Sequence, residues 1–243
     1  MSENTPQART GSVPNPRLYS PRNLRRYRRL VVGLSHKLAW KVDNDHLLDL
    51  YAALMTPTHL EVGPADAHFL LRSPAPAGSS GEPVSAALRQ IHLMDLNDGP
   101  LDYCAPRLAE HGLVIPHRHD VLTAPWPLGD ASVGSVGMFH VLHCVPGASL
   151  RHKQTAFTEA ARVLSQGGVF IGSTLLGVED PHTHNNHLAR RLQHVYNQPG
   201  RNIFHNTGDR LTDLRAMLDL HFASVELTVM GAAGVWVAKE PRR

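Results

Sequence analysis

The chain has 243 residues, of which 42% are hydrophobic and 19% charged, with a formal net charge of +3 at pH 7. This composition belongs to a globular protein with one substantial core, and it excludes an intrinsically disordered chain. Because no apolar run approaches the ~18 residues of a membrane span, a helical membrane protein is also excluded. We therefore expect one soluble, cytoplasmic domain.

The N-terminal residues carry most of the excess positive charge. Residues 1–16 are rich in Ser, Thr, Pro and Asn and lack the apolar stretch of a signal peptide, so they are predicted to form a disordered tail. Residues 17–56 are predicted to form a helical cap. The basic residues at its start are Arg17, Arg22, Arg25, Arg26, Arg28 and Arg29. An apolar stripe with helical spacing runs between them, at Leu24, Tyr27, Val31, Leu34 and Leu38. We therefore favour a solvated basic helix face over a nucleic-acid surface.

Strand and helix patterns alternate through the rest of the chain. The predicted strands are residues 58–62, 91–96, 114–116, 133–141, 169–175, 224–230 and 235–239. The predicted helices are residues 43–55, a short helix through Leu70 and Leu71, and residues 102–111, 149–164, 186–196 and 212–220.

Helix-capping and loop-forming residues support several boundaries of these predicted helices and strands. Asn44 or Asp45 suits the cap of the helix at 43–55. Ser149 suits the cap of the helix at 149–164, and the pair Gly167-Gly168 suits its end. Residues 73–83 are rich in Pro, Gly and Ser and are predicted to form a surface loop.

The order of these elements predicts an α/β fold. Strands separated by helices favour a mainly parallel sheet that is covered on both faces. The last two strands are joined only by residues 231–234, which is too short for a crossover, so they are predicted to form an antiparallel hairpin.

Five segments lie at or beside the ends of predicted strands. They are residues 59–67 (HLEVGPADA), 93–97 (LMDLN), 119–121 (HDV), 138–147 (MFHVLHCVPG) and 164–170 (LSQGGVF). Together they resemble motifs of class I S-adenosylmethionine-dependent methyltransferases. Tyr196, Asn197, Phe204, His205, Asn206 and Asp209 resemble a downstream segment of microbial small-molecule methyltransferases. The similarity extends from about residue 30 to residue 238. The resemblance implies a core domain over residues 57–243 with a Rossmann-like, seven-stranded, mainly parallel sheet, a C-terminal antiparallel hairpin and helices on both faces.

The resemblance implies methyl transfer from S-adenosylmethionine to a small molecule, such as a secondary metabolite. The residues that it places at the cofactor are Glu61, Gly63, Pro64, Asp95, Leu96, Asp120, Val121 and Phe139. Ligands of open parallel sheets bind outside the carboxyl ends of the strands, where these residues fall. The carboxylate of Asp95 suits the ribose hydroxyls and that of Asp120 suits the adenine amino group. Glu61 can face the cofactor's ammonium group.

The chain departs from the family pattern at two places. The family usually has Gly at three alternate positions of the turn after the first strand, where this chain has Gly63, Ala65 and Ala67. A Cβ at Ala65 would intrude where the backbone approaches the cofactor. Gly134 stands where the family often has Asp. A catalytically impaired protein of the same fold, acting as a ligand- or partner-binding module, therefore stays open as an alternative.

Catalytic and acceptor-binding residues are expected from the segments around this site. His140 and His143 follow the fourth strand and are predicted near the methyl donor, where a histidine suits proton removal, although each could equally shape the pocket floor. The acceptor is expected to contact aromatic and amide side chains, namely Trp40, Tyr51, Tyr196, Asn197 and Phe204. Ordinary core packing of Trp40 is the competing interpretation.

The cysteines and the grouped histidines indicate neither a disulfide nor a metal site. Cys104 and Cys144 are expected to be reduced thiols, and Cys144 a core residue. The groups His182, His184, His187 and His117, His119 match no structural zinc pattern, so no metal is expected.

Methylation of RNA or protein is a third interpretation, supported only by the basic helix. An oxidoreductase is disfavoured because the G-x-G-x-x-G fingerprint is missing. A homodimer is left open.

Overall fold

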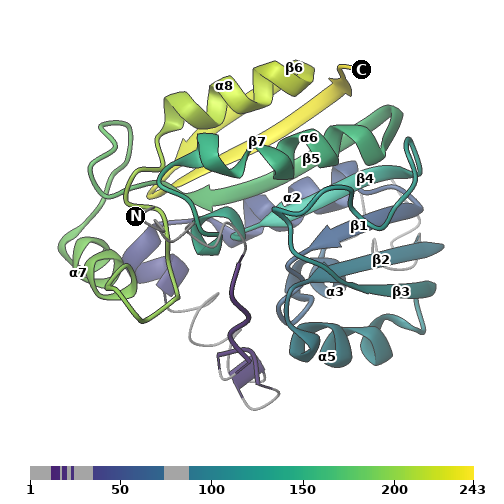
Figure 1. Cartoon of the computed structure of the whole chain (residues 1–243), viewed down its shortest axis with the longest axis horizontal. Coiled ribbons are helices and arrows are strands. Elements are labelled where there is room, and N and C mark those ends of the chain that lie inside the picture. The colour runs from purple at the N-terminus through teal and green to yellow at the C-terminus, as the bar shows by residue number, and fades with distance from the viewer. Residues whose placement is uncertain (1–11, 17, 21–22, 25–34, 74–87) are drawn as a thin grey trace, which may run out of the picture.

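The computed structural model describes residues 12–16, 18–20, 23–24, 35–73 and 88–243, in which a seven-stranded sheet forms the centre (Figure 1). Its order is β3-β2-β1-β4-β5-β7-β6. The strands are β1 (Thr58–Val62), β2 (Gln90–Asp95), β3 (Leu113–Arg118), β4 (Val133–Phe139), β5 (Leu164–Leu175), β6 (Phe222–Met230) and β7 (Ala233–Pro241). The first five strands run parallel, and β7 is antiparallel to both β5 and β6. The predicted Rossmann-like sheet with its C-terminal hairpin is confirmed.

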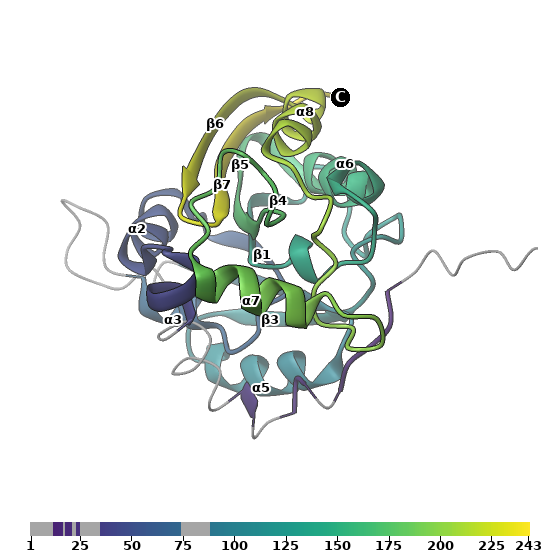
Figure 2. The same ribbon diagram turned by 90° about the vertical axis from the view of Figure 1, so that its left-hand side faces the viewer.

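Helices cover both faces of the sheet, as expected. They are α2 (Asn44–Leu54), α3 (His68–Arg72), α5 (Asp98–Leu108), α6 (Gln154–Val163), α7 (His187–Tyr196) and α8 (Leu211–His221), with short 3-10 turns η2 (Leu142–Cys144) and η3 (Leu150–Lys153). One core cluster joins the sheet to α6 and α8, and a second joins it to α2, α3 and α5. Helix α7 crosses the end of the sheet (Figure 2). The carboxyl ends of the parallel strands are therefore partly covered by α7.

The helix predicted over residues 149–164 is shorter than expected at both ends. Residues 150–153 form the 3-10 turn η3, and the Ser149 hydroxyl makes no capping hydrogen bond. At the other end, Leu164 pairs with Val133 and so begins β5. The ladder between β4 and β5 is interrupted after this pair, and Gly167 adopts a φ of +79° there. Gly167 and Gly168 thus interrupt a strand and do not terminate a helix.

Other element boundaries also differ from the predictions. The side chain of Asp43, and not that of Asn44 or Asp45, caps α2 by accepting from the backbone N–H groups of Asp45 and His46. The helix predicted over 102–111 begins earlier, at Asp98. The hairpin turn contains only residues 231–232, because β7 begins at Ala233, earlier than the predicted residue 235.

Much of the predicted basic helix lies outside the described residues, as do all six of its arginines and most of the loop at 73–83. Leu24 of the predicted apolar stripe is buried, whereas Leu38 is 47% exposed. Residues 35–40 form a π-helical turn. A π-helical turn changes which side chains share a face, which explains why Leu38 leaves the apolar stripe.

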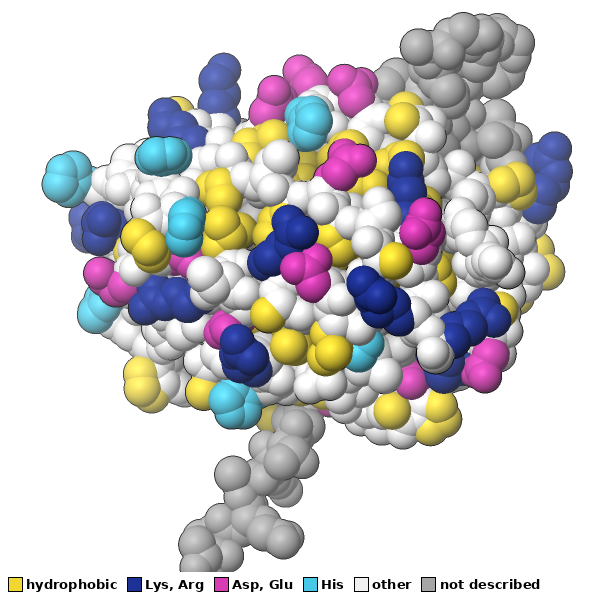
Figure 3. All heavy atoms as spheres, turned by 90° about the horizontal axis from the view of Figure 1, so that it is seen from above, with side chains coloured by type: hydrophobic (Ala, Val, Ile, Leu, Met, Phe, Trp, Pro, Cys, Tyr) yellow, Lys and Arg dark blue, Asp and Glu magenta, His cyan; other side chains and the backbone are white. Residues whose placement is uncertain are grey.

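The surface around α8 carries charges of both signs. Arg215 and Asp219 form an ion pair of 2.7 Å along α8, and Arg151 forms another of 2.7 Å with Asp213. Figure 3 shows basic and acidic side chains interspersed over the face seen from above in Figure 1. The part of the chain that the structure describes contains no helix long and apolar enough to cross a membrane.

Candidate active site

Two adjoining cavities lie at the carboxyl ends of the parallel strands. The first, which we call the strand-end cavity, has a volume of about 120 Å³ and lies beside Gly63, Asp95 and Asp120. The second, which we call the aromatic cavity, has a volume of about 310 Å³ and lies beside Trp40 and Phe204. Residues that line both cavities are Tyr19, His140, Cys144 and Ile203. A small recess beside the turn after β1 adjoins the strand-end cavity and is also lined by His140.

The structure brings together most of the residues that the sequence predicts at the site. Six predicted cofactor residues line the strand-end cavity, namely Gly63, Asp95, Leu96, Asp120, Val121 and Phe139. The other two, Glu61 and Pro64, line the recess. Trp40, Tyr196, Phe204, His140 and His143 line the aromatic cavity.

Tyr51 and Asn197, which were predicted to contact the acceptor, lie elsewhere. Tyr51 is fully buried and packs against Phe69 and Phe139, so it belongs to the core of the α2 face. Asn197 donates from its side chain to Gln193 O and to Asn206 Oδ1. Its amide therefore holds the end of α7 against the 205–209 segment and lines neither cavity.

Asp95 stands at the end of β2 with one carboxylate oxygen already bonded. Its Oδ1 accepts from the backbone N–H of Asn97 at 2.7 Å and from the Asn97 side chain at 3.1 Å. Burial raises the pKa of Asp95 to about 6, against the lowering effect of these hydrogen bonds. At neutral pH Asp95 is therefore a carboxylate that can accept from a diol, and protonation within a mildly acidic range reduces its acceptor capacity.

We expect Asp95→Ala to weaken the binding of S-adenosylmethionine at least tenfold, because each hydrogen bond to a charged group contributes about 1.5–3 kcal/mol. In the unmodified chain, affinity should fall as the pH decreases through about 6, since protonation removes an acceptor from the carboxyl group. Asp95→Asn serves as the matched control, because its affinity should be lower at neutral pH and nearly independent of pH. Calorimetric titration from pH 5 to 8 checks both points. Unchanged affinity in folded Asp95→Ala would remove this residue from the site.

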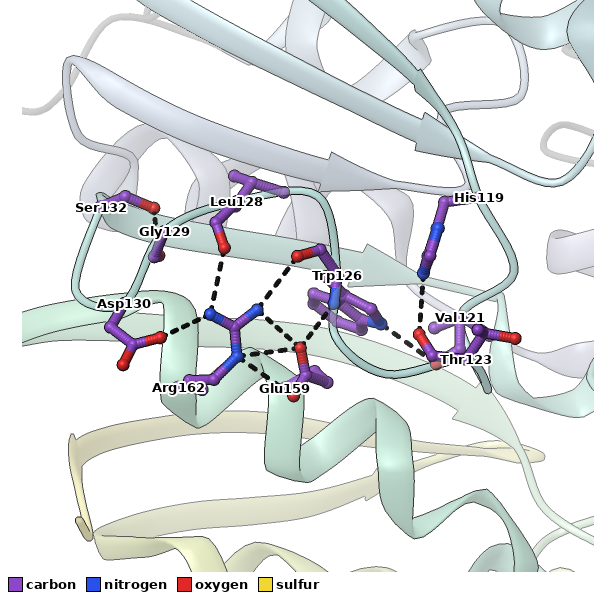
Figure 4. A network of polar contacts seen from close by, with 10 residues as sticks. All are labelled: His119, Val121, Thr123, Trp126, Leu128, Gly129, Asp130, Ser132, Glu159 and Arg162. Atoms are coloured by element: carbon purple, nitrogen blue, oxygen red, sulfur yellow. Dashed lines mark hydrogen bonds and ion pairs between the residues drawn. The ribbon is translucent and has the colours of Figure 1, made fainter.

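Asp120 and Val121 belong to the loop between β3 and β4. Figure 4 shows how Arg162 and Glu159 of α6 hold this loop in place. Arg162 donates to the carbonyls of Leu128 and Trp126 at 3.0 and 3.1 Å and pairs with the carboxylates of Glu159 and Asp130 at 2.7 and 2.6 Å. Glu159 raises the pKa of Arg162 further, so the guanidinium remains charged. The indole of Trp126 donates to Val121 O at 3.1 Å, which links this anchor to the cavity wall.

Glu61 lies beneath the site in a buried polar network. The Tyr51 hydroxyl is 2.6 Å and His59 Nε2 is 3.0 Å from Glu61 Oε2. Burial and the nearby Glu61 carboxylate raise the pKa of Tyr51 well above its usual value, so Tyr51 stays protonated and donates a hydrogen bond to Glu61. Gly137 makes room for the network, because a Cβ there would lie 2.6 Å from both Glu61 Oε2 and Tyr51 Oη. The Glu61 carboxylate is thereby fixed at the edge of the recess.

The turn after β1 has a left-handed conformation at each of its alternate small residues. The φ angles are +66° at Gly63, +49° at Ala65 and +57° at Ala67. At Gly63 a Cβ would also lie 2.5 Å from Val141 Cγ2, so glycine is required there. The two alanines adopt the same backbone conformation at an energetic cost. At Gly134 a side chain would meet Thr56 Oγ1 at 2.5 Å, so the Asp common in the family would not fit.

We expect Ala65→Gly to raise the free energy of unfolding by about 0.5–1 kcal/mol, because relief of the left-handed strain exceeds the added entropy of the unfolded chain. Cofactor affinity should be unchanged or higher. Ala216→Gly in α8, which lies in an ordinary helix, should instead destabilise the protein by about 1 kcal/mol. Chemical denaturation and calorimetry check both variants. Clearly weaker cofactor binding by Ala65→Gly would show that the Ala65 methyl group is not an intrusion.

His140 occupies the junction of the cavities. It is the first residue after β4 and turns the chain with a φ of +57°, so it ends the strand earlier than the predicted residue 141. Its Nε2 lies 3.3 Å from Ser173 Oγ, and its Nδ1 is buried without a hydrogen-bond partner among the described residues. Burial lowers the pKa of His140 well below its usual value, and His36 and His143 add to this effect. The imidazole is therefore neutral at physiological pH.

His143 has a different environment from His140. Its Nδ1 lies 3.4 Å from the backbone N–H of Leu175, and its ring stands edge-on to Phe204 at 4.6 Å between centroids. Burial lowers the pKa of His143 to about 3. It contacts the aromatic cavity but not the strand-end cavity. The geometry therefore suits a wall residue.

A buried ion pair supports this wall from behind. Lys153 Nζ is 2.7 Å from Asp209 Oδ2 and also donates to the carbonyls of Leu142 and His205, at 2.8 and 3.0 Å. Both charged side chains are 0% exposed. The backbone N–H of His205 in turn donates to His143 O at 2.7 Å. The pair therefore fixes the η2 turn that carries His143.

Sequence reasoning missed several residues at the site. His36 packs on His140 with 4.4 Å between ring centroids, and its Nδ1 lies 2.6 Å from Asn44 Oδ1. Ser12 and Asn15 border the strand-end cavity, although they belong to the predicted disordered tail. No local pattern marks these residues, because their contacts join distant parts of the chain.

No metal centre is evident in the described part of the molecule. Within it, no group of three or more His, Cys, Asp or Glu side chains is arranged to hold a metal ion. His92 Nδ1 lies 2.8 Å from His117 Nε2, so His117 pairs with a neighbouring strand and not with His119. Neither Cys104 nor Cys144 forms a disulfide.

Comparisons with known proteins agree with the geometry. A family model described as a methyltransferase domain matches residues 76–172. Demethylluteothin O-methyltransferase of Streptomyces thioluteus is 32% identical over 207 residues, covering 83% of this chain and 80% of the relative. Methyltransferase verB of Penicillium polonicum is 30% identical over 236 residues, covering 94% and 99%. The solved structure of the S-adenosylmethionine-dependent methyltransferase SibL, 24% identical, matches with a TM-score of 0.56 over 82% of this chain and 55% of SibL, which is a likeness of fold.

Proposed function

Because the chain belongs to the family of S-adenosylmethionine-dependent methyltransferases, we propose that it methylates a hydroxyl group on an uncharged, largely apolar small molecule, with His140 as the proton acceptor. The observation that carries this proposal is the position of His140, which lines both the strand-end cavity and the aromatic cavity. A group that contacts both cavities stands between a methyl donor in one and a methyl acceptor in the other.

The strand-end cavity fits the cofactor chemically. The carboxylates of Asp95 and Asp120 follow successive strands and offer acceptors for ribose hydroxyls and an adenine amino group. Glu61 lies at the recess, where it can face an ammonium group. The cofactor supplies the methyl group on a sulfonium. The chain's own contribution is to hold the two reactants in line, from which most of the acceleration of such reactions comes.

The aromatic cavity suits an apolar acceptor. Rings of Trp40, Tyr196 and Phe204 pack together in its wall, with centroid distances of 6.0 Å from Trp40 to Phe204 and 5.0 Å from Tyr196 to Phe204. The Trp40 carbonyl is held by the N–H of Ala232 in the terminal hairpin, at 2.8 Å. No Lys, Arg, Asp or Glu is found among the described residues of the wall. A charged acceptor would therefore lose its hydration without gaining an ion pair.

A neutral His140 favours a hydroxyl acceptor. With Nε2–H donated to Ser173 Oγ, Nδ1 carries the lone pair and would take the proton of an acceptor hydroxyl, so that His140 would become an imidazolium. The bound cofactor would supply the methyl group to the hydroxyl oxygen. The Streptomyces relative is named an O-methyltransferase, which supports oxygen as the atom that receives the methyl group. We expect the acceptor to be a secondary metabolite. Whether the protein forms a homodimer is left open.

Transfer of radiolabelled methyl groups from S-adenosylmethionine to a panel of ring compounds tests the proposal. The panel contains 2-naphthol, 2-naphthylamine and 2-naphthoic acid, together with wider sets of uncharged phenols and alcohols. We expect label in hydroxyl compounds and none in the carboxylate. Label only in amines would contradict the choice of oxygen. Cofactor binding without transfer to any acceptor would favour the catalytically impaired alternative.

A further inference from the structure

A segment of the N-terminal region, residues 12–16 and 18–20, crosses the outer side of the strand-end cavity, and we call it the strap. Its first described residue contacts Asp120: Ser12 N–H donates to Oδ2 at 2.7 Å and the Ser12 hydroxyl donates to Oδ1 at 2.9 Å. The two residues are 108 positions apart in the sequence. The strap is thus attached to the carboxylate that suits the adenine amino group.

Two further groups hold the middle of the strap. Asn15 N–H donates to Asn97 Oδ1 at 2.7 Å, and Asn97 in turn donates to Asp95. On the opposite side, Asn15 Nδ2 donates to Asn202 O at 3.2 Å and Asn202 Nδ2 donates to Val13 O at 3.1 Å. The strap therefore bridges the ends of β2 and β3 and the segment after α7.

The hydrogen bonds to Asp120 leave room for a ligand. Oδ1 accepts from the Ser12 hydroxyl and from Leu122 N–H, whereas among the described residues Oδ2 accepts from Ser12 N–H alone. Since each carboxylate oxygen can accept about two hydrogen bonds, one acceptor position remains on Oδ2 for an amino group. The strap and an adenine can thus share Asp120 instead of competing for it.

The strap narrows the strand-end cavity. The strand-end cavity of about 120 Å³ is bordered by Ser12, Val13 and Asn15. Small-molecule sites usually enclose about 300–1,000 Å³. Leu18 and Tyr19 of the same strap also line the aromatic cavity. Displacement of the strap would open the first cavity and remove part of the wall of the second.

We propose that the strap is part of the cofactor site, with Ser12 and Asn15 as positioning residues that orient Asp120 and Asn97 and retain the cofactor by closing over it. This inference rests on the proposed function, because it takes the methyl donor to be the ligand of the strand-end cavity. The cofactor enters and leaves only when the strap is detached. Because the strap also completes the aromatic cavity, the cofactor binds before the acceptor and its product leaves last.

The test measures the dissociation rate of S-adenosylhomocysteine from the immobilised full-length chain by surface plasmon resonance. Ser12→Ala removes one donor to Asp120 and Ser12→Pro removes both. The rate should increase about tenfold for Ser12→Ala, as expected for one hydrogen bond to a charged group, and more for Ser12→Pro. Ser224→Ala on β6, which lines neither cavity, is the matched control and should not change the rate.

A double-mutant cycle separates positioning from a general structural effect. If Ser12 acts through Asp120, Ser12→Ala should have no further effect on the dissociation rate in an Asp120→Ala background. Tighter binding by Ser12→Ala would overturn the proposal in favour of competition between Ser12 and adenine. Equal rates for Ser12→Pro and the unmodified chain would overturn it while leaving the proposed function intact. Absence of binding by the unmodified chain would instead contradict the proposed function itself.

Discussion

Replacement of His140 by Asn is expected to lower the turnover of methyl transfer by about 10²–10⁴-fold, the usual range for loss of a positioned general base. Asparagine tolerates the left-handed backbone at this position, where φ is +57°, and it cannot accept a proton. The affinity for S-adenosylhomocysteine should be unchanged, because the carboxylates that suit the nucleoside are intact. Steady-state kinetics and calorimetry together check this expectation.

The pH dependence of turnover gives a second readout for His140. A base must be neutral to accept a proton, and burial lowers the pKa of His140 well below its usual value. At saturating cofactor, turnover should therefore remain constant as the pH decreases from 8 to about 6.5, where an ordinary histidine is already half protonated. His194→Asn on the exposed side of α7 is the matched control and should behave as the unmodified chain. Equal turnover of His140→Asn and the unmodified chain would show that His140 only shapes the cavity.

Replacement of Lys153 by Met is expected to lower the free energy of unfolding by about 3–5 kcal/mol, because it leaves a buried charge without its partner. Asp209 would be left fully buried, and the carbonyls of Leu142 and His205 would lose their shared donor. Burial raises the pKa of Asp209 to about 6 even beside the Lys153 ammonium, which shows how strongly this environment disfavours the charge.

Two further variants identify the cause of the Lys153 effect. The double variant Lys153→Met/Asp209→Leu should recover a large part of the loss, since no unpaired charge remains. Arg215→Met, which breaks the exposed pair with Asp219, should cost less than about 0.5 kcal/mol. Chemical denaturation measures all three variants. A loss for Lys153→Met as small as that for Arg215→Met would mean that the buried pair contributes little.

The sheet and its ligand-facing edge were predictable because the signals are local. A short apolar run followed by Asp95, or by Gly63, marks both a strand and its carboxyl end. Parallel strands place these ends along one edge, and the family resemblance assigns eight cofactor residues to that edge. All eight lie in the strand-end cavity or its recess. Their contact with the cofactor stays a prediction until a complex is seen.

Residues whose roles depend on distant partners were not predictable. The spacing of Tyr51 fits an amphipathic helix, but it does not reveal that the Tyr51 hydroxyl donates a hydrogen bond to the buried Glu61 carboxylate. The sequence does not reveal that Lys153 pairs with Asp209, because the two residues are 56 positions apart. Leu164 continues the helical pattern, yet pairing with Val133 draws it into β5. In each case a tertiary contact decides between locally equivalent alternatives.

The strap shows the same limit at the N-terminal end. Residues 12–16 have the composition of a disordered tail, and hydrogen bonds with Asp120, Asn97 and Asn202 from other segments hold their path. Short polar side chains are uninformative in sequence because they suit both loops and hydrogen-bonded contacts.

A crystal structure of the chain with S-adenosylhomocysteine tests the central claim most directly. We predict that the ribose hydroxyls lie within hydrogen-bond distance of the Asp95 carboxylate, that the adenine amino group faces Asp120, and that the sulfur points toward His140 and the aromatic cavity. A nucleoside bound away from both carboxylates, or a sulfur turned away from His140, would contradict the account.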